Sequence, residues 1–126
     1  MLPVVTPAEM RAIDAAATEP VEVLVDRAGA VVARAALQLL GGAYGRTVVV
    51  LAGPGNNGAD GRVAAERLRR RGVAATVLDA LDLPASLPVS DLVIDAAFGT
   101  GFRGTWRPPA VGDARVLAVD VPTGLD

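Results

Sequence analysis

Residues 48–61, with the sequence VVVLAGPGNNGADG, decide the fold because they run from a strand through a tight glycine-rich turn into a helix. The segment 48–51 is short, β-branched and uncharged, which is typical of a strand buried on both faces of a sheet. Four glycines follow between positions 53 and 61, and glycine can adopt positive φ and let a ligand approach the backbone closely. The stretch therefore predicts a strand, a ligand-binding loop and a helix over residues 59–71.

The start of this helix is the first candidate binding site. Its free backbone N–H groups and its dipole would point at a ligand held by the loop, and both favour a phosphate. Asn56, Asn57 and Asp60 add side-chain oxygens at the same place. Two simpler interpretations stay open: the loop only ends a strand, or Asp60 caps its own helix.

The loop differs from two well-known phosphate-binding loops. Residues 53–58 match the pattern Gly-x-Gly-x-x-Gly of dinucleotide-binding folds, but such a match is weak by itself. The nearest acids that could bind a ribose in that fold, Asp79 and Asp82, are not in a clear position for it. A Walker loop needs a lysine after its glycines, and the chain has no lysine, because all 12 basic residues are arginine.

Composition narrows the class of protein. A length of 126 residues suits one domain, and 52% hydrophobic residues are ample for a core. The net charge of −2 argues against a nucleic-acid partner, and the basic cluster of Arg67 with residues 69–71 is typical of a solvated helix end. Without cysteine or histidine, acid–base chemistry must use Asp, Glu, Tyr44 or water.

The sequence also bears on location. Its start lacks the basic and apolar pattern of a signal peptide. No apolar stretch approaches the roughly 20 residues that a membrane-spanning helix needs. We therefore expect no membrane partner and a cytoplasmic location, in a bacterial or organellar cytosol.

Helix and strand signals alternate along the chain. A capping box at residues 6–9 opens a predicted helix to residue 17, and Glu19-Pro20 opens a second that ends at Leu40 before two glycines. Beyond these helices, strands alternate with helical or loop crossovers, which indicates a parallel sheet. We therefore expect an α/β fold, a three-layer, Rossmann-like, doubly wound, mostly parallel sheet with two N-terminal helices. Its strands are predicted at residues 47–51, 74–78, 91–95 and 116–121.

Two passages and the end of the chain are short for this fold. Residues 78–91 and 104–115 are each near the minimum length of a parallel crossover, and the sequence stops just past a strand. One face of such a sheet would expose apolar surface, so we expect a partner subunit or a natural continuation to cover it. Residues 1–126 are thus predicted to be one domain that is incomplete at its C-terminus.

Three polar, glycine-bearing loops follow predicted strands, at residues 53–61, 95–104 and 120–126. Ligands of open parallel sheets bind beyond the carboxyl ends of the strands, so these loops should meet at one edge. Asp95 and Asp120 lie at strand ends and can reach into that crevice. An Asp in this position is often only an N-cap or a turn former, so each remains a candidate.

The same loops offer a second anion site and a cation site. The backbone of residues 99–104 with Thr100 can cradle a phosphate, and Arg103 either contacts it or faces solvent. The oxygen set of Asn57, Asp95 and Thr123 is chemically a hard-cation site. One carboxylate with several neutral oxygens suits a monovalent ion such as K⁺ better than Mg²⁺.

Together the three loops resemble those of the NAD(P)HX epimerase family, the YjeF N-terminal domain. The matching segments are GPGNNGADG at residues 53–61, DLVIDAAFGTGFRG at 91–104 and VDVPTGLD at 119–126. The N-terminal segments MRAID at 10–14 and LVDRAG at 24–29 are similar too. The resemblance covers nearly the whole chain, and three ordered motifs are far more specific than one glycine pattern.

The resemblance implies an activity and a set of site residues. Family members interconvert the R and S forms of hydrated NADH and NADPH (NADHX and NADPHX), and a separate dehydratase repairs one epimer. The family's K⁺ ligands correspond to Asn57, Asp95 and Thr123. Asp120 or Asp95 would carry the proton while the ring hydroxyl leaves and returns through a planar iminium. The residues implied to bind the substrate are Asn56, Asn57, Gly58, Ala59, Asp60, Gly99, Thr100, Gly101, Phe102, Arg103, Gly104, Thr105 and Asp120.

The chain departs from the family in a few places. Ala59 stands where Gly is usual, and Thr123 replaces Ser while it keeps the hydroxyl. The crossovers before residue 91 and after residue 104 are shorter, and the last third of the family domain is absent. We therefore expect a homodimer, or fusion to or partnership with an NAD(P)HX dehydratase.

Two other functions stay open at this point. The chain could be a non-catalytic nucleotide-binding or dimerisation module of the same fold, although a scaffold has no chemical need for Asp95, Asp120 and the Asn pair. A plain NAD(P)-dependent oxidoreductase domain is disfavoured, because the sequence has neither a separate catalytic region nor a clear ribose-binding acid.

Overall fold

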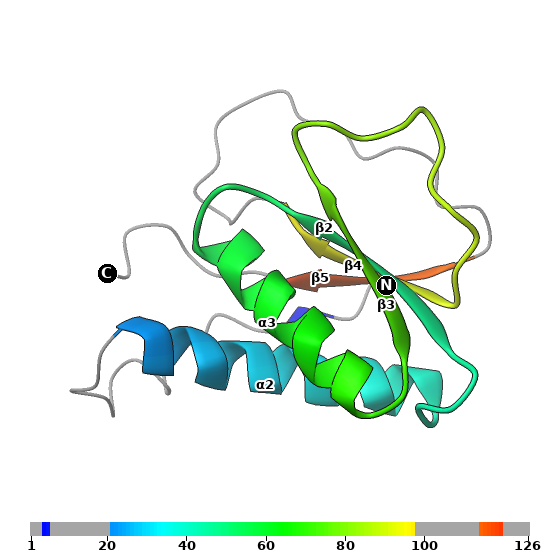
Figure 1. The fold of residues 1–126 in the computed structure, drawn as a ribbon, viewed down its shortest axis with the longest axis horizontal. Helices are drawn as coiled ribbons and strands as arrows, with labels where there is room; N and C mark the ends of the chain where they lie inside the picture. The colour runs from blue at the N-terminus through cyan, green and yellow to red at the C-terminus, as the bar shows by residue number, and fades with distance from the viewer. Residues whose placement is uncertain (1–3, 6–20, 98–113, 120–126) are drawn as a thin grey trace.

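The computed structural model describes residues 4–5, 21–97 and 114–119, and every structural statement below concerns these residues. Five parallel strands form one sheet in the order β1-β5-β4-β2-β3, and two helices lie against it (Figure 1). None of the described helices is long and apolar enough to cross a membrane. The elements are β1 (Val4–Val5), α2 (Val21–Leu40), β2 (Thr47–Ala52), α3 (Asn56–Arg70), β3 (Ala74–Asp79), β4 (Leu92–Ala96) and β5 (Arg115–Val119).

The predicted α/β fold with a parallel sheet is confirmed. The four predicted strands lie within two residues of β2, β3, β4 and β5, and the second predicted helix is α2. The helix expected over residues 6–17 lies outside the described residues. Strand β1 is not predicted from sequence, because two valines form a strand only through their pairing with Ala118 and Val119 of β5. Helix α3 begins at Asn56, three residues before its predicted start.

The order of the strands determines where a ligand can bind. The connections β1–α2–β2 and β2–α3–β3 move toward one edge of the sheet, whereas those from β3 to β4 and from β4 to β5 move back. Right-handed crossovers that move in opposite directions lie on opposite faces, so the direction changes between the neighbouring strands β2 and β4. The carboxyl ends of these two strands form the topological switch point, where doubly wound sheets bind ligands.

The two helices cover one face of the sheet and form the larger core (Figure 1). Val48 and Val50 of β2 and Ile94 of β4 point into it, together with Val32 of α2 and Leu68 of α3. All five side chains are at most 1% exposed. Burial of a side chain of this size stabilises a fold by about 1.5–3 kcal/mol, so this core fixes α3 on the sheet.

The opposite face is covered by the chain itself at its centre. Val49, Leu51 and Val93 are buried there, at 1–3% exposed. Leu83 and Leu87, from the passage between β3 and β4, pack against them. The expectation that this face exposes apolar surface is therefore wrong for these residues, because a crossover without a helix still carries leucines that cover the strands.

A polar contact joins the amino ends of β2 and β4. The carboxylate of Asp91 accepts hydrogen bonds from the backbone N–H of Thr47 at 2.8 Å and from its hydroxyl at 3.2 Å. In return, the N–H of Asp91 donates to the Thr47 carbonyl at 3.0 Å. The backbone hydrogen bond holds the pKa of Asp91 below its ordinary value of 3.8, against a smaller effect of desolvation. The contact holds in register the two strands whose far ends form the switch point.

Replacement of Asp91 by Asn should lower the melting temperature at neutral pH, because the amide keeps the shape but loses the charge-assisted bonds. A carboxyl whose pKa is lowered by folding stabilises the protein above its ordinary pKa and loses that contribution as the pH falls through the lowered value. The difference between wild type and D91N in thermal unfolding should therefore shrink as the pH is lowered through the acid range. Asp82→Asn removes an equal charge from an exposed residue and is the control. A difference that stays constant over pH would contradict this role of Asp91.

Candidate functional site

The loops that follow β2 and β4 meet at the switch point. The N–H of Gly53 donates to the carbonyl of Ala96 at 3.0 Å, which extends the pairing of the two strands by one residue. The carbonyl oxygen of Ala97 occupies the space that a Cβ at Gly53 would need. The predicted loops at residues 53–61 and from residue 95 onward thus begin as one contiguous edge.

The glycines of the first loop serve close packing rather than left-handed backbone. None of the four glycines uses the positive φ that is open to it, and the described residues with positive φ lie elsewhere in the chain. A Cβ at Gly58 would overlap the carbonyl oxygen of Gly53, and a Cβ at Gly61 would come within 2.7 Å of Ala96 Cβ. Side chains at these positions would therefore keep α3 away from the ends of β2 and β4.

Helix α3 presents its N-terminus at this edge without a side-chain cap. Its N-cap is Gly55 (φ −95°), and in the described part of the chain no side chain bonds to the free N–H groups of its first turn as a cap. Asp60 is not the cap, because it lies in the second turn and is only 4% exposed. The first turn, with Asn56, Asn57 and Gly58, carries no acid. Its N–H groups and the positive end of the dipole are therefore suited to an anion.

Asn57 links this helix to a third strand. Its side chain is 4% exposed, and Nδ2 donates to the carbonyl of Val119 at 3.0 Å. The bond runs from the first turn of α3 to the last residue of β5, directly before Asp120. It holds the strand end that leads to Asp120 beside α3. Any cation ligand from Asn57 must be Oδ1, because the amide nitrogen Nδ2 is only a hydrogen-bond donor.

Asp95 lies on β4, between Leu51 of β2 and Ala118 of β5. It is half-buried, and its Oδ1 accepts a hydrogen bond from the N–H of Ala97 at 3.2 Å. Burial raises the pKa of this carboxyl above its ordinary value of 3.8, and the bond to Ala97 opposes the rise only in part. By the alternation of β4, Asp95 shares a sheet face with Val93. The carboxyl thus stands at the polar end of an apolar face.

Arg62 belongs to this edge and is missed by the sequence reasoning. Its Nη1 donates to the carbonyl of Gly53 at 3.1 Å, so α3 holds the loop that precedes it. Arg62 lies one helical turn after Gly58, which is the single hint of this contact in the sequence. Nothing else in the sequence distinguishes Arg62 from the other arginines on the exposed face of this helix.

The structure places part of the predicted site. Asn57 and Asp60 are buried and Asp95 is half-buried, all at this edge of the sheet. Asn56 is exposed and Ala59 is half-buried in the same two turns of α3. The remaining predicted site residues lie outside the described residues, namely Gly99, Thr100, Gly101, Phe102, Arg103, Gly104, Thr105, Asp120 and Thr123.

The side chains of this edge suit one kind of metal ion. No group of three or more His, Cys, Asp or Glu side chains that could hold a metal occurs in the described ranges. Asn57 and Asp95 instead supply one amide oxygen and one carboxylate, which are ligands for a hard cation of low charge. The charge of the Asp95 carboxylate is not offset by any described cation, since only a backbone hydrogen bond lowers its pKa. A bound cation would supply that missing charge.

Residues 21–88 match the family described as YjeF-related protein N-terminus. The match spans α2, β2, the glycine loop, α3 and β3, which together make up one side of the switch point. The chain belongs to this family. The resemblance noted in the sequence is therefore confirmed at the level of the family.

Curated relatives carry names that refer to hydrated NAD(P)H. The chain is 37% identical over 142 residues to the bifunctional NAD(P)H-hydrate repair enzyme Nnr of Hyperthermus butylicus, with 82% of this chain and 26% of the relative covered. It is 36% identical over 134 residues to the NAD(P)H-hydrate epimerase of Ajellomyces capsulatus, with 82% and 56% covered. It is 37% identical over 113 residues to the NAD(P)H-hydrate epimerase of Rhodobacter capsulatus, with 64% and 53% covered.

These alignments also describe how the chain differs from its relatives. The chain spans little more than half of the two epimerases and about a quarter of the bifunctional enzyme. The first two alignments are longer than the 126 residues of the chain, so these relatives carry additional residues between the matched segments. The short crossovers predicted from the sequence agree with this difference.

One solved structure has the same fold. The crystal structure of yeast ynu0 (YNL200c) superposes with a TM-score of 0.51 at 24% sequence identity. The superposition covers 98% of this chain and 72% of the yeast chain. The parallel sheet with its helices is therefore an arrangement already seen in an experimental structure.

Replacement of Gly58 by Ala should destabilise the chain by about 1–3 kcal/mol, because the new Cβ would collide with the Gly53 carbonyl. In a helix position with free space around the Cβ, the same change would stabilise the protein by roughly 0.5–1 kcal/mol. A loss of stability in this variant would therefore be caused by the collision. Gly55→Ala is the control without a collision, since nothing lies within 4 Å of a Cβ there and its only expected cost is that of Ala at an N-cap. Urea unfolding measures both changes, and equal stabilities of the two variants would contradict the packing role of Gly58.

Replacement of Asp95 by Asn should raise the free energy of unfolding at neutral pH, measured by urea unfolding in a buffer whose only cation is tetramethylammonium. A carboxyl whose pKa is raised by folding favours the folded state when protonated. The stability of the wild type should therefore fall as the pH rises from the ordinary pKa of 3.8 through the raised value, and D95N should lack this fall. Asp82→Asn should leave the pH profile of the wild type unchanged. A D95N variant less stable than the wild type at neutral pH would contradict the cost assigned to this carboxylate.

Proposed function

We propose that the chain epimerises the R and S forms of hydrated NADH and NADPH, as a step of nicotinamide cofactor repair. The observation that carries the proposal is the arrangement at the switch point, where an uncapped helix N-terminus, buried Asn57 and half-buried Asp95 occupy one edge. The names of the relatives in Ajellomyces capsulatus and Rhodobacter capsulatus support it.

The proposed substrate carries a diphosphate, and the start of α3 offers a place for one phosphate. The N–H groups of the first turn and the dipole of a helix of 15 residues attract an anion there. The half-buried Ala59 leaves less room for this approach than the Gly usual in the family. Residues 99–105, with Thr100 and Arg103, are the proposed second phosphate contact.

The proposed reaction moves one proton out and back. A carboxyl group gives its proton to the ring hydroxyl, the C–O bond breaks and water leaves, while the electron pair of the ring nitrogen forms the C=N bond of a planar iminium. Water then adds to the opposite face, the C=N pair returns to nitrogen, and the added water returns a proton to the carboxylate. Asp120 and Asp95 are the proposed proton carriers, since the chain has no histidine and both acids lie at strand ends.

We also propose K⁺ as a cofactor, held by Asn57, Asp95 and Thr123. The support is the oxygen character of these side chains and the charge of Asp95, which no cation among the described residues offsets. A bound K⁺ supplies a fixed positive charge beside the substrate. Asp95 would stay ionised as its ligand, and the proton transfer would then fall to Asp120.

The proposed function implies a second enzyme. Relatives in Hyperthermus butylicus and Thermofilum pendens are named bifunctional repair enzymes. We therefore propose that the chain works with an NAD(P)HX dehydratase, either fused to it or separate, in the cytoplasm. A homodimer is the other proposed assembly, and light scattering during gel filtration measures it directly.

A coupled assay tests the activity. R-NADPHX is supplied with an S-specific dehydratase and its nucleotide cofactor in K⁺ buffer, and the recovery of reduced-nicotinamide absorbance is followed. The chain should speed recovery above the spontaneous rate. Asp120→Asn should reduce the gain by about 10²–10⁴-fold, the usual size of an acid–base contribution. Asp82→Asn should leave it unchanged, and replacement of K⁺ by tetramethylammonium should lower it in the wild type.

The outcomes separate the candidate functions. Recovery at the background rate, from a folded chain that still binds NADPHX, would contradict the epimerase and favour a non-catalytic nucleotide-binding module. An unchanged rate in D120N would remove Asp120 from the mechanism. Because the relatives are about twice as long or longer, the assay should include the longest natural form of the protein as a positive reference.

A further inference from the structure

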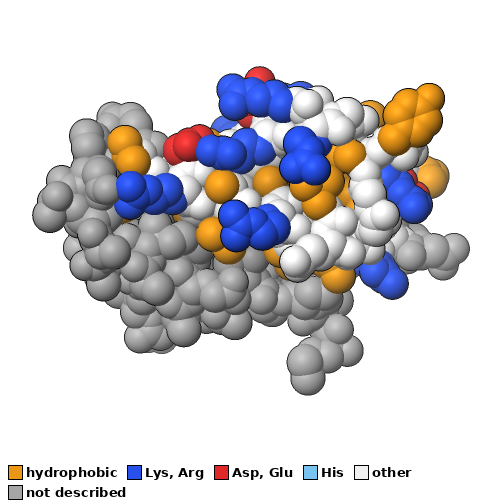
Figure 2. Space-filling view, turned by 90° about the horizontal axis from the view of Figure 1, so that it is seen from below, with side chains coloured by type: hydrophobic (Ala, Val, Ile, Leu, Met, Phe, Trp, Pro, Cys, Tyr) orange, Lys and Arg blue, Asp and Glu red, His pale blue; other side chains and the backbone are white. Residues whose placement is uncertain are grey.

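A groove runs between α2 and α3 on the outer side of the helix layer. It has a volume of about 290 Å³. Three apolar side chains of α2 form part of its lining, and arginines from both helices form the rest. Figure 2 shows blue arginine side chains spread around orange apolar ones over this face. The lining residues are Ala30, Ala33, Arg34, Leu37, Arg67, Arg70 and Arg71.

The groove is distinct from the switch point. Arg67 lies ten residues after Asn57 on the same helix, which corresponds to about 15 Å along its axis. The sequence predicts a solvated helix end from Arg67 and residues 69–71, and most of these side chains are indeed exposed. What the sequence does not show is that Arg34 of α2 joins them, so that cations from two helices surround apolar side chains.

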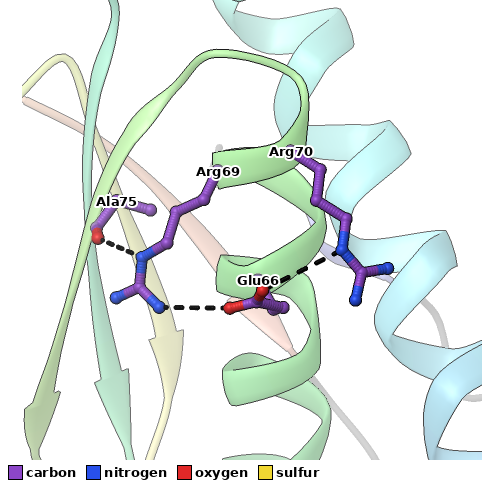
Figure 3. Close-up of polar contacts among 4 residues, drawn as sticks. All are labelled: Glu66, Arg69, Arg70 and Ala75. Carbon is purple, nitrogen blue, oxygen red and sulfur yellow. Dashed lines mark hydrogen bonds and ion pairs between the residues drawn. The ribbon is translucent and has the colours of Figure 1, made fainter.

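Two consecutive arginines of α3, Arg69 and Arg70, contact different parts of the structure. Arg69 donates from Nε to the carbonyl of Ala75 at 2.9 Å and lies 3.6 Å from Glu66, so it holds β3 (Figure 3). Arg70 extends to the other side of Glu66, toward α2, at 3.9 Å from its carboxylate (Figure 3). Arg70 is therefore directed to the groove, while its neighbour is committed to the sheet.

The cations of the groove are only partly neutralised. Arg67 pairs with Asp26 at 2.7 Å, but its Nε is buried and makes no hydrogen bond in the described structure. The guanidinium groups of Arg34 and Arg71 form no ion pair or hydrogen bond with any described residue, and no acid is among the residues that line the groove. A ligand with acceptor oxygens would supply what these groups lack.

We propose that this groove binds a small organic anion, a phosphate monoester of a compact apolar group. Arginine forks match phosphate oxygens in pairs, and Ala30, Ala33 and Leu37 offer an apolar surface to the organic part. The volume of about 290 Å³ is just below the roughly 300–1,000 Å³ of ligand pockets, which suits a ligand much smaller than a dinucleotide. The site is separate from the proposed epimerase function and does not depend on it.

Three probes test the two parts of this ligand, with binding to the whole chain measured by calorimetry at low salt. Phenyl phosphate carries both the dianion and the apolar group, inorganic phosphate carries only the charge, and phenol carries only the ring. Phenyl phosphate should bind at least about tenfold more tightly than either fragment, since each part adds an interaction. Its binding should weaken as salt is added, because salt screens the arginines.

Two variants locate the binding. The double variant Arg34→Gln with Arg71→Gln removes the unpaired cations of the groove and should weaken phenyl phosphate by roughly tenfold or more. Its control is Arg46→Gln with Arg115→Gln, which removes the same charge from two exposed residues that neither line the groove nor share an ion-pair partner with its arginines, and it should leave binding unchanged. Ala30→Leu keeps the charge and the helix propensity but fills the groove, and it should abolish the advantage of phenyl phosphate over inorganic phosphate.

The opposite results would overturn the proposal. Equal affinities for phenyl phosphate and inorganic phosphate would show a general anion surface without an apolar contact. Equal losses in the two double variants would show an effect of net charge alone. Displacement of phenyl phosphate by a short polyglutamate peptide of higher affinity would assign the groove to an acidic protein segment instead.

Discussion

The close approach of Gly58 to the carbonyl of Gly53 is the contact on which the candidate site depends. It allows the first turns of α3 to lie directly against the ends of β2 and β4. Two polar contacts then become possible, from Asn57 to Val119 and from Arg62 back to Gly53. A helix held even one methyl group farther out would lose both, because hydrogen bonds weaken steeply beyond their usual lengths. The glycines thus act on the site through packing, and the site's polar geometry follows from that packing.

Local signals in the sequence were enough for much of the fold. Short, mostly apolar runs between turn signals predict the strands to within two residues, because such runs are typical of the strands of a parallel sheet. The predicted start of α3 is three residues too late, since Asn and Gly at positions 56–58 have low helix propensity and are ordinarily assigned to a loop. There, sheet packing overrides propensity. Strand β1 and the contact of Arg62 depend on partners distant in sequence or on side-chain direction, so no local pattern could predict them.

The sequence predicts where on the sheet the candidate site lies, but it does not predict the contacts within the site. Strand ends and glycine loops identify the edge where Asn57 and Asp95 lie, because carboxyl ends of parallel strands share one edge. The bond from Asn57 to Val119 could not be foreseen, since it depends on β5 lying beside β4 rather than beyond β3. The same limit applies to the arginine groove. Its charges are visible in the sequence, but their convergence with Arg34 follows only from the packing of α2 on α3.

If a cation is bound as proposed, Asp95 and Asp120 have different roles, and the burial of Asp95 is the observation from which the division can be argued. Burial makes the charged form of Asp95 costly, and no described cation offsets that cost. A cation bound beside this carboxylate would offset the cost of its burial and hold it in the charged form. The Nδ2 of Asn57 donates to Val119, and Oδ1, as the oxygen of the amide, is the atom that would join Asp95 as a ligand in the proposed site. The same bond fixes the strand end that leads to Asp120. The proposed division, in which Asn57 and Asp95 hold the cation and Asp120 moves the proton, gives the buried Asp95 a partner for its charge.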